Sequence, residues 1–184
     1  FHKRGYKPKD KDTLKKLLKR MIKVRGDEGD FNDIDTSDIE SMESLFQFNK
    51  TFNGDITGWN VSSVISMDGM FYCAKSFNQP IGNWEFPNVE NMSCMFYDAT
   101  SFNQDVSKWK FPNVENMEFM FSYAESFNQP IGDWEFPNVK YMGNMFYGAA
   151  SFDQDLSKWD LKGKNTTDMF SDCPIKKEYK PKMK

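Results

Sequence analysis

The chain has 184 residues, a net charge of −3 and a mean hydropathy of −0.72, and it contains 18 Phe, 12 Met and 5 Trp. This abundance of aromatic residues argues against disorder, and the length suits one domain or a short array of repeats. The negative charge gives no support for nucleic-acid binding, and no apolar run of about 18 residues predicts a membrane span. Cys73, Cys94 and Cys173 are too few and too scattered for a disulfide framework or a zinc site, so we interpret them as packing residues.

Residues 1–30 are expected to form a capping helix and a loop. Asp12 or Thr13 is a suitable N-cap for a helix that ends near Val24, with leucines on one side and lysines around the rest. We expect this helix to cover the first repeat, and the alternative is a basic helix lying on a membrane. The acidic stretch at 26–38 lacks the glycine and glutamate spacing of a calcium loop and is interpreted as a solvated loop.

A repeat of 25 residues occupies most of the remaining chain, and its copies align without gaps until residue 159. The last copy is one residue shorter between Trp159 and Phe170. A fixed period of this length predicts units that bury their apolar faces against neighbouring units, with degenerate copies at both ends. We therefore expect the apolar columns to be core. These columns are Trp59, Trp84, Trp109, Trp134 and Trp159; Met42, Met67, Met92, Met117 and Met142; Phe46, Phe71, Phe96, Phe121 and Phe146; and Phe52, Phe77, Phe102, Phe127 and Phe152.

Within one repeat the apolar period changes. Trp84 and Phe86 alternate with polar residues, which predicts a short strand. Pro87 ends the strand, and Asn88 is a suitable N-cap for a short helix with apolar residues at helical spacing from Val89. A turn follows, in which Asn103 and its equivalents Asn78, Asn128 and Asp153 are expected to bond backbone groups.

The sequence thus predicts an α/β fold, specifically a leucine-rich-repeat-like, right-handed solenoid of about six coils, each a short strand plus a short helix. The solenoid is expected over residues 31–175, with strands centred on the five tryptophans. Residues 176–184 are expected to form a basic C-terminal tail.

The repeat follows the pattern W-x-[VF]-x-N-V-x-x-M-x-x-M-F-x-x-A-x-x-F-N-Q, which resembles the BspA-like family of bacterial surface repeat proteins. The resemblance covers roughly residues 34–175, and five tandem copies in register make it specific. It implies a cell-surface or secreted protein that acts in adhesion or other protein binding. It brings no catalytic residues, because the family has no established active site.

Copies two repeats apart agree best, because the outward positions of the predicted strands alternate between acidic and basic. In a parallel sheet, equivalent residues stand about 4.8 Å apart, so these positions would form ladders of opposite charge. Such ladders fix register and solubility, or they form the recognition surface, and both interpretations stay open. The candidate binding face consists of Asn83, Glu85, Lys108, Lys110, Asp133, Glu135, Lys158 and Asp160.

Enzymatic motifs are absent from the sequence, and the only histidine, His2, lies in the terminal segment. We expect no catalysis, no cofactor and no metal. The main interpretation is a protein-binding module of a bacterial surface or secreted protein, with a host or bacterial protein as partner. The alternatives are a structural spacer without a ligand and a carbohydrate-binding solenoid whose tryptophans face outward. No signal peptide is visible, so a cytoplasmic location is the alternative to the surface.

Overall fold

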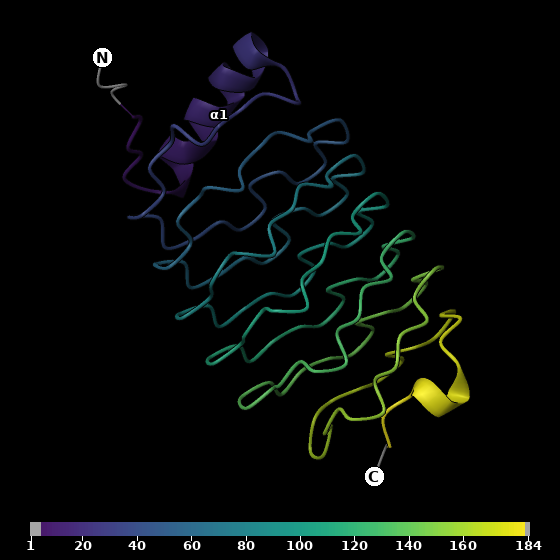
Figure 1. Cartoon of the computed structure of the whole chain (residues 1–184). Helices are drawn as coiled ribbons and strands as arrows, with labels where there is room; N and C mark the ends of the chain where they lie inside the picture. Colours follow the sequence, from purple (N-terminus) through teal and green to yellow (C-terminus); the bar gives the residue numbers. More distant parts are fainter. Residues whose placement is uncertain (1–4, 183–184) are drawn as a thin grey trace.

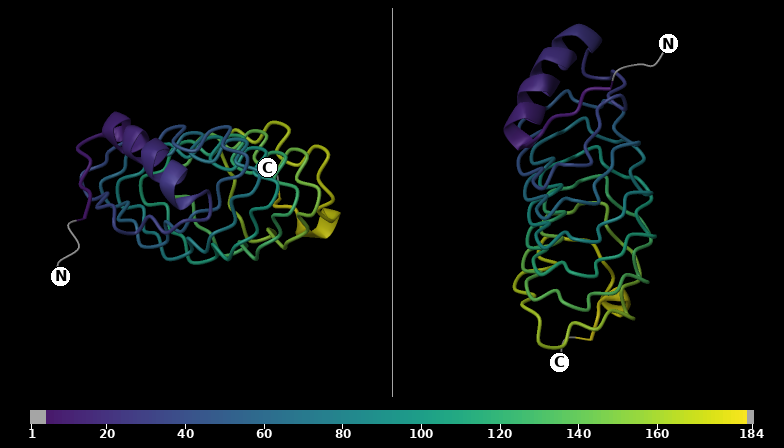
Figure 2. Two further views of the ribbon diagram at one scale, coloured as in Figure 1. Left: turned by 90° about the horizontal axis from the view of Figure 1, so that it is seen from above. Right: turned by 90° about the vertical axis from the view of Figure 1, so that its left-hand side faces the viewer.

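The computed structural model describes residues 5–182, which form a stack of similar loops of irregular backbone (Figure 1). Helix α1, Lys11–Arg25, lies across the N-terminal end of this stack, and the short 3-10 helix η1, Lys177–Tyr179, lies near the other end (Figures 1 and 2). The N-cap of α1 is Asp10, whose side chain accepts a hydrogen bond from the Thr13 N–H at 2.8 Å. The predicted caps at Asp12 and Thr13 are therefore wrong by a few residues.

The predicted fold class is wrong. Within residues 5–182 the only α-helix is α1, and the β-structure there consists of isolated parallel bridges, with no strand and no sheet. The repeats are therefore not the strand-plus-helix coils of a leucine-rich-repeat-like solenoid. Their contacts form a column of single bridges, one per repeat, joining Ser41, Ser66, Asn91, Asn116, Tyr141 and Asn165.

The predicted short helices are replaced by successive turns with left-handed residues at four-residue intervals. In the repeat that contains Met92, the φ angles of Cys94 and Asp98 are 54° and 50°. The N–H groups of Met92, Cys94, Phe96 and Asp98 donate to carbonyls of the next repeat at 2.8–2.9 Å. Between them, the N–H groups of Met95 and Tyr97 each donate to the carbonyl three residues earlier, for example Tyr97 to Cys94 at 3.1 Å, and so close four-residue turns. Apolar spacing of three and four residues fits this arrangement as well as it fits a helix, which explains the error.

The predicted strands fail for a related reason. The alternation of buried Trp84 and Phe86 with exposed Glu85 is correct. However, no ladder of backbone hydrogen bonds joins these segments in the described part of the chain. Asn88 caps no helix and instead donates its side-chain N–H to the Ser62 carbonyl of the preceding repeat at 2.8 Å. In this segment, side-chain contacts rather than strand pairing therefore join neighbouring repeats.

The expected backbone bonds of the Asn turn are confirmed, and they form a continuous ladder along the stack. The side-chain oxygen of each asparagine accepts the backbone N–H of its equivalent in the next repeat, at 3.0 Å for the Asn78–Asn103 pair. The neighbouring glutamine, for example Gln104, donates to both oxygens of Asn78 at 3.0 and 3.1 Å. The ladder runs through Asn53, Asn78, Asn103, Asn128 and Asp153 and ends at the Lys176 N–H.

The expected core columns are confirmed, because the Trp, Met and Phe columns are all buried. Ring spacing differs between the two sides of the repeat. Centroids of Phe71 and Phe96 are 5.5 Å apart, whereas those of Trp109 and Trp134 are 6.3 Å apart. The stacked rings are therefore closer together on the side of the left-handed turns than on the tryptophan side.

In the shortened last repeat, a lysine side chain bonds to the backbone of the preceding repeat. The Lys164 ammonium donates to the carbonyls of Phe136 and Val139 in the preceding repeat at 2.9 and 2.7 Å. Partial burial lowers the pKa of Lys164. Residues 176–182, expected as part of a tail, lie against this repeat: the Tyr179 carbonyl accepts the Leu156 N–H at 2.8 Å, and Lys176 pairs with Asp153 at 3.1 Å.

Candidate functional site: a row of aromatic side chains

The eight residues predicted as a binding face are all exposed. The structure brings one pair of them into an ion pair, Lys158 with Asp133 at 3.2 Å, and both side chains are highly exposed. No ion pair joins Glu85, Lys110 and Glu135 within the described residues. The predicted sheet that was to align them is absent: no backbone bridge pairs these segments in the described part of the chain.

Two shallow depressions include members of this face. Asn83 and Lys108 line one of about 470 Å³, and Asn83 and Glu85 line part of another of about 220 Å³. Long exposed side chains without fixed partners lose conformational freedom on binding, so this face is a weakly organised surface.

A different feature lies on the side of the left-handed turns. Here partly or largely exposed aromatic rings form what we call the aromatic row, which consists of Phe48, Tyr72, Tyr97, Phe119, Tyr123 and Tyr147. Each ring of the row contacts at least one other, with centroid separations from 4.6 to 6.4 Å. Phe48 is 61% exposed and Tyr123 is 40% exposed. Successive repeats thus present one continuous aromatic surface.

The backbone turns position these rings. Phe48, Phe119 and Tyr123 themselves occupy left-handed positions, with φ of 60°, 57° and 54°. Such a conformation is costly for a bulky residue and is held here by the hydrogen bonds to the next repeat, for example Tyr123 N–H to the Tyr147 carbonyl at 2.8 Å. The row is therefore built on a fixed backbone rather than on a mobile loop.

The rings of the row also differ in which part they present to solvent. Tyr72 and Tyr97 stack in parallel, with centroids 4.6 Å apart and an interplanar angle of 2°, so each covers one face of the other. Tyr97 and Tyr123 meet edge to face at 72°. Partial burial raises the pKa of the Tyr72 and Tyr97 hydroxyls. A tyrosine hydroxyl is protonated at neutral pH even without this shift, so both can donate hydrogen bonds.

Polar groups border the row at Tyr97. Lys75 pairs with Asp98 at 3.1 Å, and the Cys73 Sγ lies 3.5 Å from the same carboxylate. Burial and then the hydrogen bond to Asp98 raise the pKa of Cys73. An aromatic strip with a polar border is the composition found at the centre and rim of protein interfaces.

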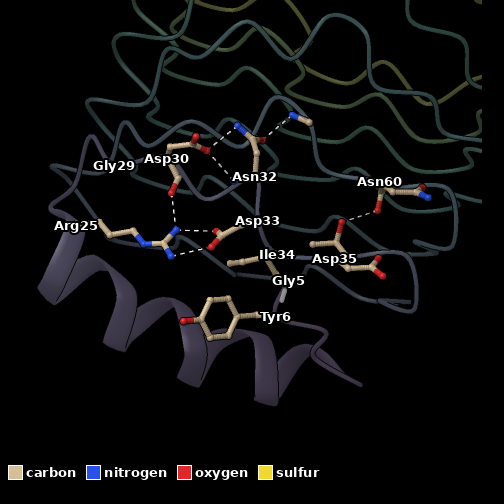
Figure 3. Close-up of a pocket in the computed structure, with 12 residues that line it drawn as sticks. Gly5, Tyr6, Arg25, Gly29, Asp30, Asn32, Asp33, Ile34, Asp35 and Asn60 are labelled. Atoms are coloured by element: carbon tan, nitrogen blue, oxygen red, sulfur yellow. Dashed lines mark hydrogen bonds and ion pairs between the residues drawn. The ribbon is translucent and has the colours of Figure 1, made fainter. Parts of the chain in front are cut away.

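A hollow of about 1080 Å³ lies at the N-terminal end (Figure 3). Its central group is Arg25, which bonds both carboxylate oxygens of Asp33 at 2.7 and 2.9 Å and the Asp30 carbonyl at 2.6 Å. The hydrogen bond to Asp33 raises the pKa of Arg25. The segment at Tyr6 pairs with the chain at Ile34 beside it. These polar groups bind one another, so the hollow is a structural junction between α1 and the first repeat.

The buried tryptophan columns exclude one form of carbohydrate binding, because their rings do not reach the surface. Trp109, Trp134 and Trp159 donate their indole N–H to carbonyls of the preceding repeat, at 3.0–3.2 Å. Trp84 is buried like the others, but its indole N–H has no partner among the described residues. Trp109 has Phe86 of the preceding repeat as an edge-to-face neighbour at 4.9 Å. The residue equivalent to Phe86 for Trp84 is Val61, which has no ring.

Sequence reasoning missed the aromatic row, although a signal for it was present. A tyrosine follows the buried phenylalanine directly in three repeats, at Tyr72, Tyr97 and Tyr147. In the repeat between the last two, Tyr123 is displaced by one position and Ser122 takes the place after Phe121. On the predicted helices, Tyr72, Tyr97 and Tyr147 would share one direction and Tyr123 would point about 100° away from it, so no continuous row is expected.

The structure thus defines a tandem-repeat protein of stacked loops with an exposed aromatic surface. The chain matches, over residues 13–126 and again over 88–180, the family described as "Mycoplasma protein of unknown function, DUF285". It belongs to this family, in agreement at a coarse level with the repeat resemblance found in the sequence. Neither the comparison with curated proteins nor that with solved structures found a match. In the part of the chain that the structure describes, no helix has the length and apolarity needed to cross a bilayer.

Proposed function

We propose that the chain is a noncatalytic protein-binding module of a bacterial surface or secreted protein, and that the aromatic row is its binding site. The single observation that carries this proposal is the continuity of exposed aromatic rings across successive repeats. Tyrosine and phenylalanine supply large contact areas at a small cost in side-chain entropy, and they dominate the energetics of protein interfaces. The family and the BspA-like repeat pattern support the surface location.

A protein partner fits the row better than a sugar does. A sugar ring stacks on the open face of an aromatic ring, and Tyr72 and Tyr97 cover one face of each other. The edges and hydroxyls that remain suit a surface of apolar side chains and backbone carbonyls.

The test places a photo-crosslinking phenylalanine analogue at position 97, and at position 85 as a matched control on the charged face. A protein captured from host or bacterial extracts is then purified and titrated in solution. We expect saturable binding that Tyr97→Ala with Tyr123→Ala weakens at least tenfold, while Lys108→Glu with Lys110→Glu leaves it unchanged.

Two results would contradict the proposal. Equal binding by the tyrosine variant, together with loss in the lysine variant, would move the site to the charged face. Absence of any saturable partner at either position would favour a structural spacer.

A further inference from the structure

Helix α1 has one buried apolar face and one exposed basic face. Its apolar face is used inside the molecule: Leu14, Leu17, Leu18 and Met21 are buried in the core cluster. Its outward face is basic and exposed, and it carries Lys15, Lys16, Lys19, Arg20 and Lys23. The buried apolar face anchors the helix, so the basic face is held in a fixed position.

The outward cations lack counterions. No ion pair involves any of these five residues within residues 5–182. Nearby cations outside this face do have partners: Lys11 pairs with Glu43 at 3.7 Å and Arg25 with Asp33 at 2.7 Å. Four of the five cations line one depression of about 590 Å³ together with Thr13. The face therefore presents concentrated positive charge that the fold itself does not neutralise.

This charge lies at the N-terminal end of a stack whose middle repeats are acidic. Residues 1–25 contain eleven lysines and arginines and two aspartates, whereas residues 26–161 contain six lysines and 22 acidic residues. Helix α1 lies across the end of the stack, so its outward face points away from the acidic repeats (Figures 1 and 2). Residues 162–184 contain seven lysines and three acidic residues, so the chain is basic at both ends and acidic between them, with the larger excess of positive charge at the α1 end.

We propose that the outward face of α1 binds the surface of an anionic lipid bilayer and holds the stack end-on. A flat anionic surface repels the acidic middle repeats and attracts the α1 end, which has the larger excess of positive charge, more strongly than the C-terminal end. The apolar face of α1 is already occupied, so binding takes place by charge at the headgroups and without insertion of the helix. The aromatic row, on the side of the stack, stays free for a protein partner.

The test measures co-sedimentation with vesicles of phosphatidylcholine alone and of phosphatidylcholine mixed with phosphatidylglycerol. We expect binding to the mixed vesicles only, and release as salt is raised. Replacement of Lys16, Lys19, Arg20 and Lys23 by Gln should weaken binding roughly a hundredfold, because each cation near the surface contributes separately. The matched control replaces Lys50, Lys162, Lys177 and Lys182 by Gln, which removes the same charge elsewhere and should leave binding within about threefold.

Circular dichroism and thermal unfolding of both variants show whether each retains the fold. Equal binding to neutral vesicles, or equal loss in the two variants, would overturn the proposal. So would a soluble polyanion such as heparin that binds the chain more tightly than the vesicles do, because it would identify a different class of partner. None of these outcomes depends on the crosslinking at position 97, so this inference and the proposed function fail independently.

Discussion

The two sides of each repeat hold the stack together by different means. On the side of the left-handed turns, backbone N–H groups donate to the next repeat at every second residue from Met92 to Asp98. On the tryptophan side, buried rings and indole N–H groups make the contacts, and the rings are spaced more widely. The comparison teaches that a repeat needs backbone pairing on only one side, provided that large side chains fill the other.

The largest effect is expected on the tryptophan side. Replacing Trp109 by Ala removes a fully buried ring, its stacking on Trp134 and its hydrogen bond to Ile81, and should lower the free energy of unfolding by about 3–5 kcal/mol. Trp84→Ala should cost less, because the Trp84 indole N–H has no partner among residues 5–182. Urea denaturation of both variants measures the difference.

Trp159→Ala provides a second reference for the same experiment, because the shortened last repeat packs on one full neighbour only. Its cost should also fall below that of Trp109→Ala. Equal costs for all three variants would show that the indole hydrogen bonds and the flanking rings contribute little, and that the tryptophan side is held by burial alone.

The second prediction concerns the turn side, where Cys94 occupies a left-handed position. Burial, followed by the nearby charges of Asp68 and Glu118, raises the pKa of its thiol to about 11. At pH 8 its alkylation should therefore be about 100-fold slower than that of an ordinary thiol, because only the thiolate reacts. The folded state holds this proton more tightly than the unfolded state does, so the associated stabilisation is present below the ordinary thiol pKa and is lost as the pH rises toward 11.

The measurement follows iodoacetamide labelling by mass spectrometry from pH 7 to 11, with labelling in urea as the control. A rate at position 94 that matches the unfolded chain at every pH would mean that the turn side is not closed around this thiol.

The third prediction concerns the asparagine ladder at the edge of the repeats. Asn103→Ala removes an acceptor for the Asn128 N–H and the Gln129 side chain, and should cost about 1–2 kcal/mol. Asn103→Asp keeps the acceptor, as Asp153 does in the last repeat, and should cost less than half as much. Thermal unfolding of the two variants measures the difference, and equal costs would show that the acceptor oxygen of Asn103 does not carry the stabilisation.

The repeat, its buried columns and its asparagine bonds could be predicted from the sequence, because these depend on side-chain type at a fixed period. The local backbone could not. Apolar residues three and four apart suit both an α-helix and successive turns. Gly69 hints at the left-handed position that holds Cys94 and Phe119 in later repeats, and Gly148 hints at the one that holds Asp98 and Tyr123 in earlier ones.

In the candidate site, too, the exposure of side chains could be predicted but the backbone that positions them could not. Exposure of Glu85 and Lys110 followed from alternation with buried rings, but their predicted pairing depended on a sheet that is absent from the described part of the chain. The aromatic row required knowledge of the turns, since Tyr97 and Tyr123 differ in repeat position and meet only because the backbone turns between Cys94 and Asp98.

The smallest effect gives the most direct test of the central claim, that left-handed turns replace helices in the repeats. Gly69 has φ of 58°, and a Cβ there would meet other atoms only at 3.6 Å, so there is room for a methyl group. Gly69→Ala should therefore lower the free energy of unfolding by about 1 kcal/mol through backbone strain alone. In the equivalent position of the preceding repeat, Ser44→Gly should be neutral or stabilising, because Ser44 has φ of 54°. If this segment were a helix, Gly69→Ala would instead stabilise the chain by about 1 kcal/mol, and that result would contradict the account.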